Sequence, residues 1–200
     1  RANISEKDEV LVLGAAGGVG LAAVDIAKAY GARVVAAVSN KEKAEVCIGY
    51  GVDDVIVYGS KKLDKDGQIA FTKELKSKSK RGGYSIIYDP VGDCFSEPAL
   101  RSIGWGGTYL VVGFAAGKIP SLPSNLMLLK GCAVSGVFIG RFQKEEPVVH
   151  AKNLKTLGAL LAEGKINPLI SKTVPMKDAV SSIEDIARRK ILGKVVFLND

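Results

Sequence analysis

The chain has 200 residues and a formal net charge of +7, and 47% of its residues are hydrophobic while 24% are charged. This composition predicts a globular protein of one to one and a half domains, and no apolar run approaches the roughly 18 residues of a membrane-spanning helix, which excludes a membrane protein. The basic excess lies mainly between residues 61 and 81, where no aromatic side chains alternate with the lysines to stack bases, so we expect no nucleic-acid partner.

The first predicted element is a strand over residues 10–13, Val-Leu-Val-Leu, which stops at the turn Gly-Ala-Ala-Gly-Gly-Val-Gly of residues 14–20. Apolar residues then recur with the spacing of one helix face, at Val19, Ala22, Ala23, Ile26, Ala27 and Tyr30. A strand, a glycine-rich turn and a helix in this order are typical of dinucleotide-binding sites.

The glycine turn has a physical role in such a site. The start of a helix leaves backbone N–H groups unpaired and carries partial positive charge, and a pyrophosphate satisfies both. Gly17 and Gly18 lack a Cβ atom, which lets a diphosphate approach the backbone, and Gly20 lets the helix pack closely on the strand. The usual G-x-G-x-x-G pattern has glycine where this chain has Ala15, but Gly14 precedes it and can take the tight turn. An α/β turn that binds nothing is the alternative.

The end of the second predicted strand, residues 33–38, bears on the choice of cofactor. An NAD site places an Asp or Glu about 20 residues after the glycines, where it accepts a hydrogen bond from the ribose 2′-hydroxyl. Neither Ser39 nor Asn40 is acidic, and a hydroxyl, an amide and nearby lysines suit a 2′-phosphate instead. We therefore favour NADPH over NADH. The alternative is that Ser39 or Asn40 only caps the next helix.

Helices and strands alternate as far as residue 163. They are a helix over 41–50, a strand over 55–58, a helix over 67–78, a strand over 84–88, a helix that ends near 103, a strand over 108–112, a short helix or turn over 125–130, a strand over 132–137 and a helix over 145–163. Residues 104–107, Gly-Trp-Gly-Gly, are predicted to form a turn. The alternation predicts an α/β fold with a doubly wound parallel Rossmann sheet of about six strands and helices on both faces. Tyr58 ends the third strand at the edge where ligands bind, and it either flanks the adenosine half of a cofactor or caps the sheet.

The last 37 residues break the alternation. A helix is predicted to start within residues 174–178 and a final strand to cover 194–198, and this tail need not join the same sheet. We therefore divide the chain into a Rossmann domain over residues 1–163 and a tail over 164–200.

The cysteines and the single histidine limit the chemistry available to the chain. Cys47, Cys94 and Cys132 are far apart and odd in number, which predicts reduced structural thiols in a reducing compartment. His150 is the only histidine, so a histidine-based metal site or a Ser-His-Asp triad has little material. We name no catalytic residue and no metal ligand in this chain.

Four motifs together resemble one family. They are the strand and glycine turn of residues 10–20, Asp-Pro-Val-Gly at 89–92, Val-Gly-Phe-Ala-Ala-Gly-Lys-Ile-Pro at 112–120, and Gly-Lys-Val-Val at 193–196. Their order and spacing along nearly the whole chain are similar to the quinone oxidoreductase branch of the medium-chain dehydrogenases and reductases, relatives of the zinc-type alcohol dehydrogenases. The resemblance implies that this chain is the cofactor-binding part of a longer two-domain enzyme, and that the tail packs on a β-rich amino-terminal catalytic domain.

The resemblance also assigns roles, carried over position by position. It implies pyrophosphate contacts at Gly17, Gly18 and Val19, 2′-phosphate contacts at Ser39, Asn40 and Lys43 with Tyr58 beside them, nicotinamide contacts at Val112, Gly113 and Phe114, backbone contacts to the carboxamide at Val137, Phe138 and Ile139, and an approach from the tail by Lys194.

The implied activity is an NADPH-dependent hydride transfer to a quinone or enone acceptor, with this chain inactive by itself because half of the cleft is missing. In family members that hold zinc, the ligands come mainly from upstream of this region, so no zinc is expected here. The family also implies a homodimer paired through the sixth strand, and we expect a cytoplasmic protein, with the mitochondrion as the alternative. A non-catalytic NADPH-binding module, regulatory or structural, is the competing interpretation.

Overall fold

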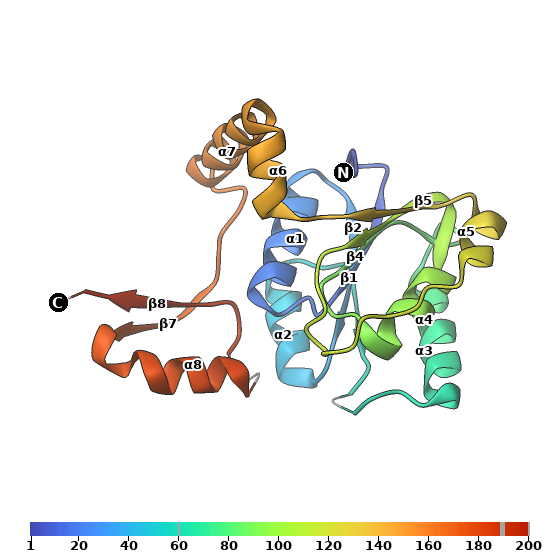
Figure 1. Cartoon of the computed structure of the whole chain (residues 1–200), viewed down its shortest axis with the longest axis horizontal. Helices are drawn as coiled ribbons and strands as arrows, with labels where there is room; N and C mark the ends of the chain where they lie inside the picture. Colours follow the sequence, from blue (N-terminus) through green and yellow to red (C-terminus); the bar gives the residue numbers. More distant parts are fainter. Residues whose placement is uncertain (60, 189–190, 200) are drawn as a thin grey trace.

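A six-stranded parallel sheet forms the centre of the fold in the computed structural model, which describes residues 1–59, 61–188 and 191–199 (Figure 1). The strand order is β3-β2-β1-β4-β5-β6, so the chain winds outwards in both directions from β1. The strands of this sheet are β1 (Glu9–Leu13), β2 (Arg33–Val38), β3 (Asp54–Val57), β4 (Tyr84–Asp89), β5 (Ile103–Val111) and β6 (Ala133–Gly136). The doubly wound Rossmann sheet expected from the sequence is therefore confirmed.

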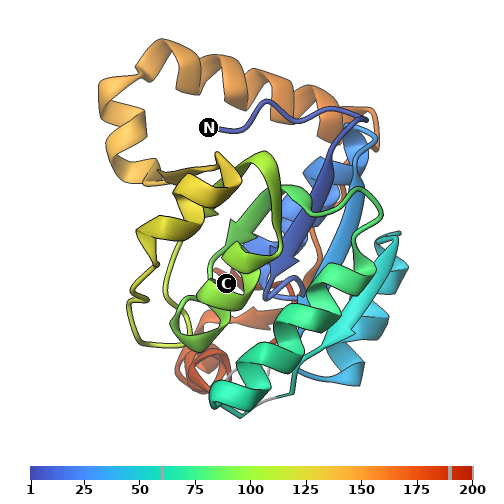
Figure 2. The same cartoon turned by 90° about the vertical axis from the view of Figure 1, so that its right-hand side faces the viewer.

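Helices cover both faces of this sheet (Figure 2). The covering helices are α1 (Gly18–Ala29), α2 (Lys41–Gly49), α3 (Lys65–Lys78), the 3-10 turn η1 (Asp93–Phe95), α4 (Ser96–Arg101) and α5 (Ser124–Lys130). Two further helices, α6 (Ile139–Glu145) and α7 (Pro147–Ala162), follow β6. None of the helices in the described part of the chain is both long enough and apolar enough to cross a membrane.

The core has two layers because successive strand residues point to opposite faces. Leu11 and Leu13 of β1 pack in the layer under α3 and α4, which also contains Leu75. Val10 and Val12 pack in the layer under α1 and α2. A strand that is buried on both faces reads as an unbroken apolar run, which is how residues 10–13 appear in the sequence.

The predicted turn at residues 104–107 is wrong, because these residues lie inside β5. The register between β4 and β5 shifts between Tyr84 and Ile86, so the glycines accommodate an irregular strand. A Cβ atom on Gly107 would lie 2.9 Å from the Tyr84 carbonyl oxygen and 2.7 Å from Ile103 Cγ1. Glycine is required here by close backbone contact within a sheet, a demand that resembles a turn signal in the sequence.

The helix predicted over 145–163 agrees with α7, which starts at Pro147 and ends at Ala162, whereas α6, directly before it, was not predicted. Proline fits the first turn of a helix, where its missing N–H is not needed, but it would break a helix interior. Both helices lack fully buried residues, and apolar side chains such as Val148 and Leu154 are exposed.

The tail begins with a strand that the sequence analysis did not predict. Ile170–Pro175 forms β7. The helix expected to start within 174–178 begins at Met176 as the 3-10 turn η2 (Met176–Asp178) and continues as α8 (Ala179–Ala187). The final strand β8 (Lys194–Leu198) agrees with expectation and pairs with β7 in parallel. These two strands form a separate sheet, which lies beside the six-stranded one in Figure 1.

Candidate functional site

The loop between β1 and α1 lies at the carboxyl edge of the sheet, where ligands bind in open α/β folds. β1 and β2 are paired in register, and the Ala15 N–H donates to the Ala37 carbonyl at 3.3 Å. Gly14 has φ +59°, and a Cβ atom there would lie 2.8 Å from Val91 Cγ2 of the loop after β4. The ends of three neighbouring strands therefore converge on this turn.

The start of α1 has no side-chain cap. Gly17 is the N-cap in an extended conformation, and glycine has no side chain that could accept hydrogen bonds from the first N–H groups of the helix. No acidic residue lies in the first turn of α1. The partial positive charge of the helix start is therefore left for an external group, and a phosphate satisfies it well.

The last three of the four glycines in residues 14–20 have different roles. A Cβ atom on Gly17 would lie 3.4 Å from the Gly14 carbonyl oxygen, an ordinary contact, so Gly17 faces mostly open space. At Gly18 it would lie 2.9 Å from the Gly193 carbonyl oxygen. At Gly20 it would lie only 2.4 Å from the Gly14 carbonyl oxygen. Gly17 thus borders open space, Gly18 allows the tail to approach, and Gly20 allows α1 to pack on the strand.

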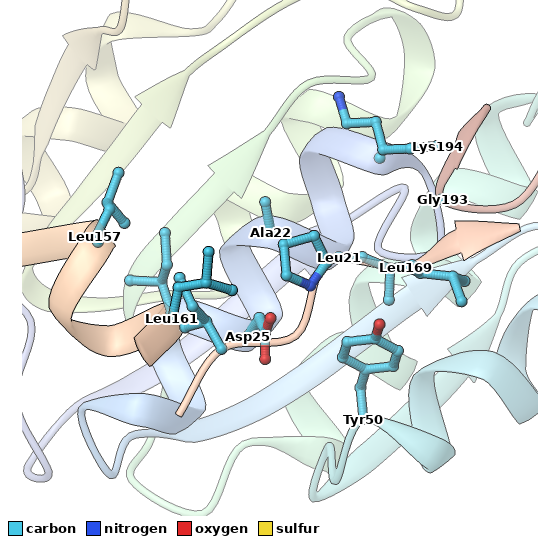
Figure 3. Close-up of a pocket in the computed structure, with 14 residues that line it drawn as sticks. Leu21, Ala22, Asp25, Tyr50, Leu157, Leu161, Leu169, Gly193 and Lys194 are labelled. Carbon is cyan, nitrogen blue, oxygen red and sulfur yellow. The ribbon is translucent and has the colours of Figure 1, made fainter. Parts of the chain in front are cut away.

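The tail reaches this loop and brings Lys194 with it. The Gly193 N–H donates to the Ala16 carbonyl at 3.3 Å, and Gly17 and Gly193 form a parallel β-bridge. Lys194 Cε lies 3.1 Å from the Cβ position of Gly18 (Figure 3). Residues 17 and 194, which are far apart in sequence, are therefore neighbours, and an ammonium group stands beside the positive end of α1.

The end of β2 carries a hydroxyl and an ammonium group in contact. Lys43 lies in the first turn of α2, and its Nζ donates to Ser39 Oγ at 3.2 Å. Asn40 is the N-cap of α2, and its Oδ1 accepts from the Lys43 N–H at 2.9 Å. The capping alternative thus holds for Asn40, while Ser39 and Lys43 form a pair that can donate to a phosphate.

The two acids after this helix are occupied elsewhere. Asp53 accepts from Lys28 Nζ and from the Val34 N–H, both at 2.8 Å. Partial burial acts to raise the pKa of Asp53, but these hydrogen bonds and the nearby charges of Lys28 and Arg33 outweigh it, so the pKa lies below its usual value. Asp54 binds Arg33 and Lys78. Both acids serve to fix α1 and α3 against the strands.

Tyr58 directly follows β3, and its N–H donates to the Val38 carbonyl at 2.9 Å. Its ring packs on Phe95 and Phe71, with centroid distances of 4.6 and 5.6 Å. The half-buried ring thus belongs to an aromatic cluster at the sheet edge, as the capping alternative expected. A contact of its remaining surface with adenosine stays a prediction.

The loops after β4 and β5 are joined through Asp89. The Val112 and Gly113 N–H groups donate to the Asp89 carbonyl at 2.9 and 3.3 Å. The buried Asp89 carboxylate accepts from the Val91 and Gly92 N–H groups at 2.8 and 2.9 Å.

The same carboxylate accepts from Ser96 Oγ at 2.6 Å and from the Tyr109 hydroxyl. Burial, reinforced by the Asp89 charge, raises the pKa of Tyr109 far above its usual value, so its hydroxyl remains a donor. Asp89 belongs to the Asp-Pro-Val-Gly motif of the family resemblance, but no role for its side chain was expected from the sequence. The signal available in the sequence was an acidic residue at the end of a strand, followed by Pro90 and, two residues later, by Gly92.

Val112, Gly113 and Phe114, which are predicted to contact the nicotinamide, directly follow β5. Val112 and Gly113 are half-buried, and the Phe114 side chain is 39% exposed. The Val137 N–H already donates to the Val111 carbonyl at 2.9 Å, which leaves only the carbonyl for a ligand. Phe138 and Ile139 are exposed. Together with residues 1–4 and α6, they line a cavity of about 680 Å³, which residues 112–114 do not line.

No cluster of three or more His, Cys, Asp or Glu side chains that could hold a metal ion occurs among residues 1–59, 61–188 and 191–199. The three cysteines are unpaired thiols. Burial raises the pKa of Cys47 to about 12 and also raises the pKa of Cys132.

Comparison with known proteins bears on what this arrangement serves. The family model described as "Zinc-binding dehydrogenase" matches residues 18–153. A mouse protein named quinone oxidoreductase-like protein 2 is 34% identical over 199 residues, which are 98% of this chain and 54% of the mouse protein. An acryloyl-coenzyme A reductase of Metallosphaera sedula is 32% identical over 198 residues, covering 98% of this chain and 52% of that enzyme.

Among solved structures, the quinone oxidoreductase of Thermus thermophilus, determined also in complex with NADPH, superposes with a TM-score of 0.78 at 26% identity. The alignment covers 98% of this chain and 58% of the Thermus chain. This chain therefore spans about half the length of the relatives it matches. Because the family model covers more than half of the 200 residues, including the start of α1 and β2 through β6, the chain belongs to the zinc-binding dehydrogenase family.

Proposed function

We propose that this chain is the NADPH-binding part of an oxidoreductase that transfers a hydride to a quinone or an enone. The observation that carries the proposal is the open start of α1, where Gly17 borders free space and Lys194 stands beside Gly18. The known binding of NADPH by the Thermus relative supports the same ligand here. Residues 1–163 would hold the cofactor, and the tail of residues 164–200 would pack on a catalytic domain outside this chain.

The residues of the carboxyl edge fit such a ligand. Its pyrophosphate would lie on the first N–H groups of α1, near Gly17, Gly18 and Val19, where a side chain at Gly17 would take its place. The Ser39 hydroxyl and the Lys43 ammonium, in contact with each other, would donate to the 2′-phosphate. Neither Ser39 nor Asn40, at the end of β2, is an acid that could accept from an unmodified ribose, which favours NADPH over NADH.

When bound, NADPH supplies the hydride from its nicotinamide ring. The work of this chain is to hold that ring at a fixed position and to keep water away from one side of it. Val112, Gly113 and Phe114 would do this, because the Asp89 carbonyl fixes the first two through hydrogen bonds. The other wall of the cleft would come from the catalytic domain, so we expect this chain alone to reduce no acceptor.

The names of the relatives favour the acceptor class. Quinones and acryloyl thioesters are both electron-poor, conjugated carbonyl compounds. Both accept a hydride from a nicotinamide, the acryloyl thioester at its β-carbon, and a proton then completes the reduction. A non-catalytic NADPH-binding module is the second candidate. It is favoured by the lack of a titratable group between Val112 and Phe114 that could donate a proton to the acceptor.

Calorimetry on the 200-residue chain tests the cofactor proposal. We expect NADPH to bind at least tenfold more tightly than NADH, because a phosphate held by two donors contributes more than about 1.4 kcal/mol. Lys43→Ala should remove most of this preference. Lys76→Ala is the matched control, because Lys76 is exposed near the end of α3, and that end leads to the opposite edge of the sheet. Equal affinities for the two nucleotides, or equal losses in the two variants, would refute the role of the Ser39 and Lys43 pair.

Two further measurements separate the candidate functions. Gly17→Val should abolish NADPH binding and leave the unfolding transition in place, because its Cβ atom has room in the protein but occupies the diphosphate position. The whole protein should oxidise NADPH, followed by absorbance, with a panel of quinones and enones. Tight NADPH binding without turnover of any acceptor would favour the module. The homodimer proposal, through the outer edge of β6, predicts a dimer mass in solution.

A further inference from the structure

Two segments of the tail region cross the outer side of α1. The first, Ile166–Leu169, leads from α7 to β7, and the second, Gly193–Lys194, leads into β8. Figure 3 shows Leu169, Gly193 and Lys194 next to α1, with Asp25 and Tyr50 on the α1 and α2 side of the same pocket. The placement of Lys194 over the phosphate loop therefore depends on how these two segments are held.

The first segment is gripped at its backbone by two side chains from different helices. The Asn167 N–H donates to Asp25 Oδ2 of α1 at 2.5 Å. The Tyr50 hydroxyl, at the C-cap of α2, donates to the Asn167 carbonyl at 2.6 Å. The backbone N–H and the carbonyl of Asn167 are thus both bonded to helices of the Rossmann domain. Neither bond depends on the side chain at position 167.

The second segment is held by the first. The Leu169 carbonyl accepts from the Lys194 N–H at 2.8 Å, two residues after Asn167. Gly193 has φ +64°, and a Cβ atom there would lie 2.6 Å from the same Leu169 carbonyl oxygen. The close approach requires glycine, so a shift of Leu169 moves the backbone of Lys194 with it.

Apolar packing does not fix the first segment by itself. A cavity of about 350 Å³ lies between this segment, α1 and α7, lined mainly by apolar side chains that include Leu21, Leu157 and Leu161. Side chains bordering a cavity have no contact partners on that side, so they hold their neighbours less firmly. The two hydrogen bonds to Asn167 therefore carry a larger share of the placement.

We propose that Asp25 and Tyr50 are positioning residues, which hold Lys194 over the start of α1 by clamping the backbone of Asn167. This inference rests on the proposed function, because it assumes that Lys194 contacts a phosphate of NADPH. Neither residue lies at the phosphate loop itself. Asp25 is seven residues beyond Gly18, a distance of about 10 Å along the helix.

The test measures NADPH affinity of the full chain by calorimetry. Lys194→Gln should weaken binding about tenfold, because a charge-assisted hydrogen bond is lost. Tyr50→Phe removes only the hydroxyl and should weaken binding about three- to tenfold, through loss of one hydrogen bond that orders Lys194. Unfolding in urea is measured for each variant, so that a change in stability is known separately.

The NADPH affinity of an Asp25 variant distinguishes a positioning role from a purely electrostatic one, because the two predict changes in opposite directions. A carboxylate on the same helix repels a bound diphosphate, so electrostatics alone predicts that Asp25→Ala tightens NADPH binding. Positioning predicts weaker binding for Asp25→Ala. Asp25→Asn is the matched control, because it loses the same charge but keeps an oxygen that can accept from Asn167, and it should bind NADPH at least as well as the unmodified chain.

A double-mutant cycle of Lys194 and Tyr50 tests whether Tyr50 acts on NADPH affinity through Lys194. In the Lys194→Gln background, Tyr50→Phe should change NADPH affinity less than twofold, because there is no longer a lysine to position. Independent, additive losses would overturn the inference, as would tighter binding by Asp25→Ala. If the unmodified chain binds no NADPH, the proposed function itself is wrong. If Lys194→Gln weakens binding and Tyr50→Phe does not, only the clamp is wrong.

Discussion

Replacing Gly20 by alanine tests whether the glycine turn is needed for folding as well as for binding. The new Cβ atom would lie 2.4 Å from the Gly14 carbonyl oxygen, 2.7 Å from Ala15 Cα and 2.9 Å from the Ala15 carbonyl carbon. All three are backbone atoms, which cannot move aside as the end of a flexible side chain can. The start of α1 must therefore shift away from β1, and the packing of Leu21 on the sheet shifts with it.

The size of the effect follows from two opposing contributions. Forcing an extra carbon into a packed interior costs about 1–3 kcal/mol, and contacts this short place Gly20→Ala near the upper value. Alanine also gains about 1 kcal/mol over glycine inside a helix. We therefore expect Gly20→Ala to lower the free energy of unfolding by about 2 kcal/mol, which at a urea m-value of about 2 kcal/mol per molar moves the midpoint down by about 1 M.

Two other Gly→Ala variants serve as controls in the same urea titration. Gly158 lies inside α7 with nothing within 4 Å of its Cβ position, so Gly158→Ala should stabilise the chain by about 0.5–1 kcal/mol. Gly17→Ala meets only an ordinary contact and should change stability by less than about 0.5 kcal/mol. A midpoint for Gly20→Ala equal to or above that of the unmodified chain would refute the close packing of α1 on β1.

Three further predictions concern buried groups. Tyr109→Phe removes one donor from the Asp89 carboxylate and should lower the free energy of unfolding by about 1–3 kcal/mol in urea titrations; no loss would mean that the hydroxyl bond is absent. Because burial raises its pKa to about 12, the Cys47 thiol stays protonated at pH 8, so iodoacetamide should modify it only after unfolding, as mass spectrometry of peptides can check. The pKa of Asp53 is lower in the folded than in the unfolded chain, so its carboxylate stabilises the fold at a pH above the unfolded pKa, and this contribution is lost as the pH falls through the folded pKa. Below about pH 4, the free energy of unfolding should therefore fall less steeply with decreasing pH in Asp53→Asn than in the unmodified chain, as urea titrations at several pH values can check.

The site could be predicted only in part, and its two halves show why. Gly17 to Gly20 and Ser39 to Lys43 lie at the ends of adjacent strands, so local pattern and the rule for parallel sheets bring them to one edge. Asp25 and Tyr50 carry no comparable signal, because a polar side chain on the outer face of a helix usually faces water. Their contact with Asn167 exists only because the chain returns across α1 after α7.

The amino-acid sequence by itself determined the alternation of strands and helices as far as β6 and the place of the glycine turn, because apolar period and glycine position are local properties of the chain. The same local signals predicted the final strand β8. Only tertiary structure decided the following features. It placed residues 104–107 inside β5, where close backbone contact demands glycine, and it paired β7 with β8 across more than twenty residues. It also brought Lys194 to Gly18, since a contact between distant residues depends on the path of the whole chain and leaves no periodic trace in either segment.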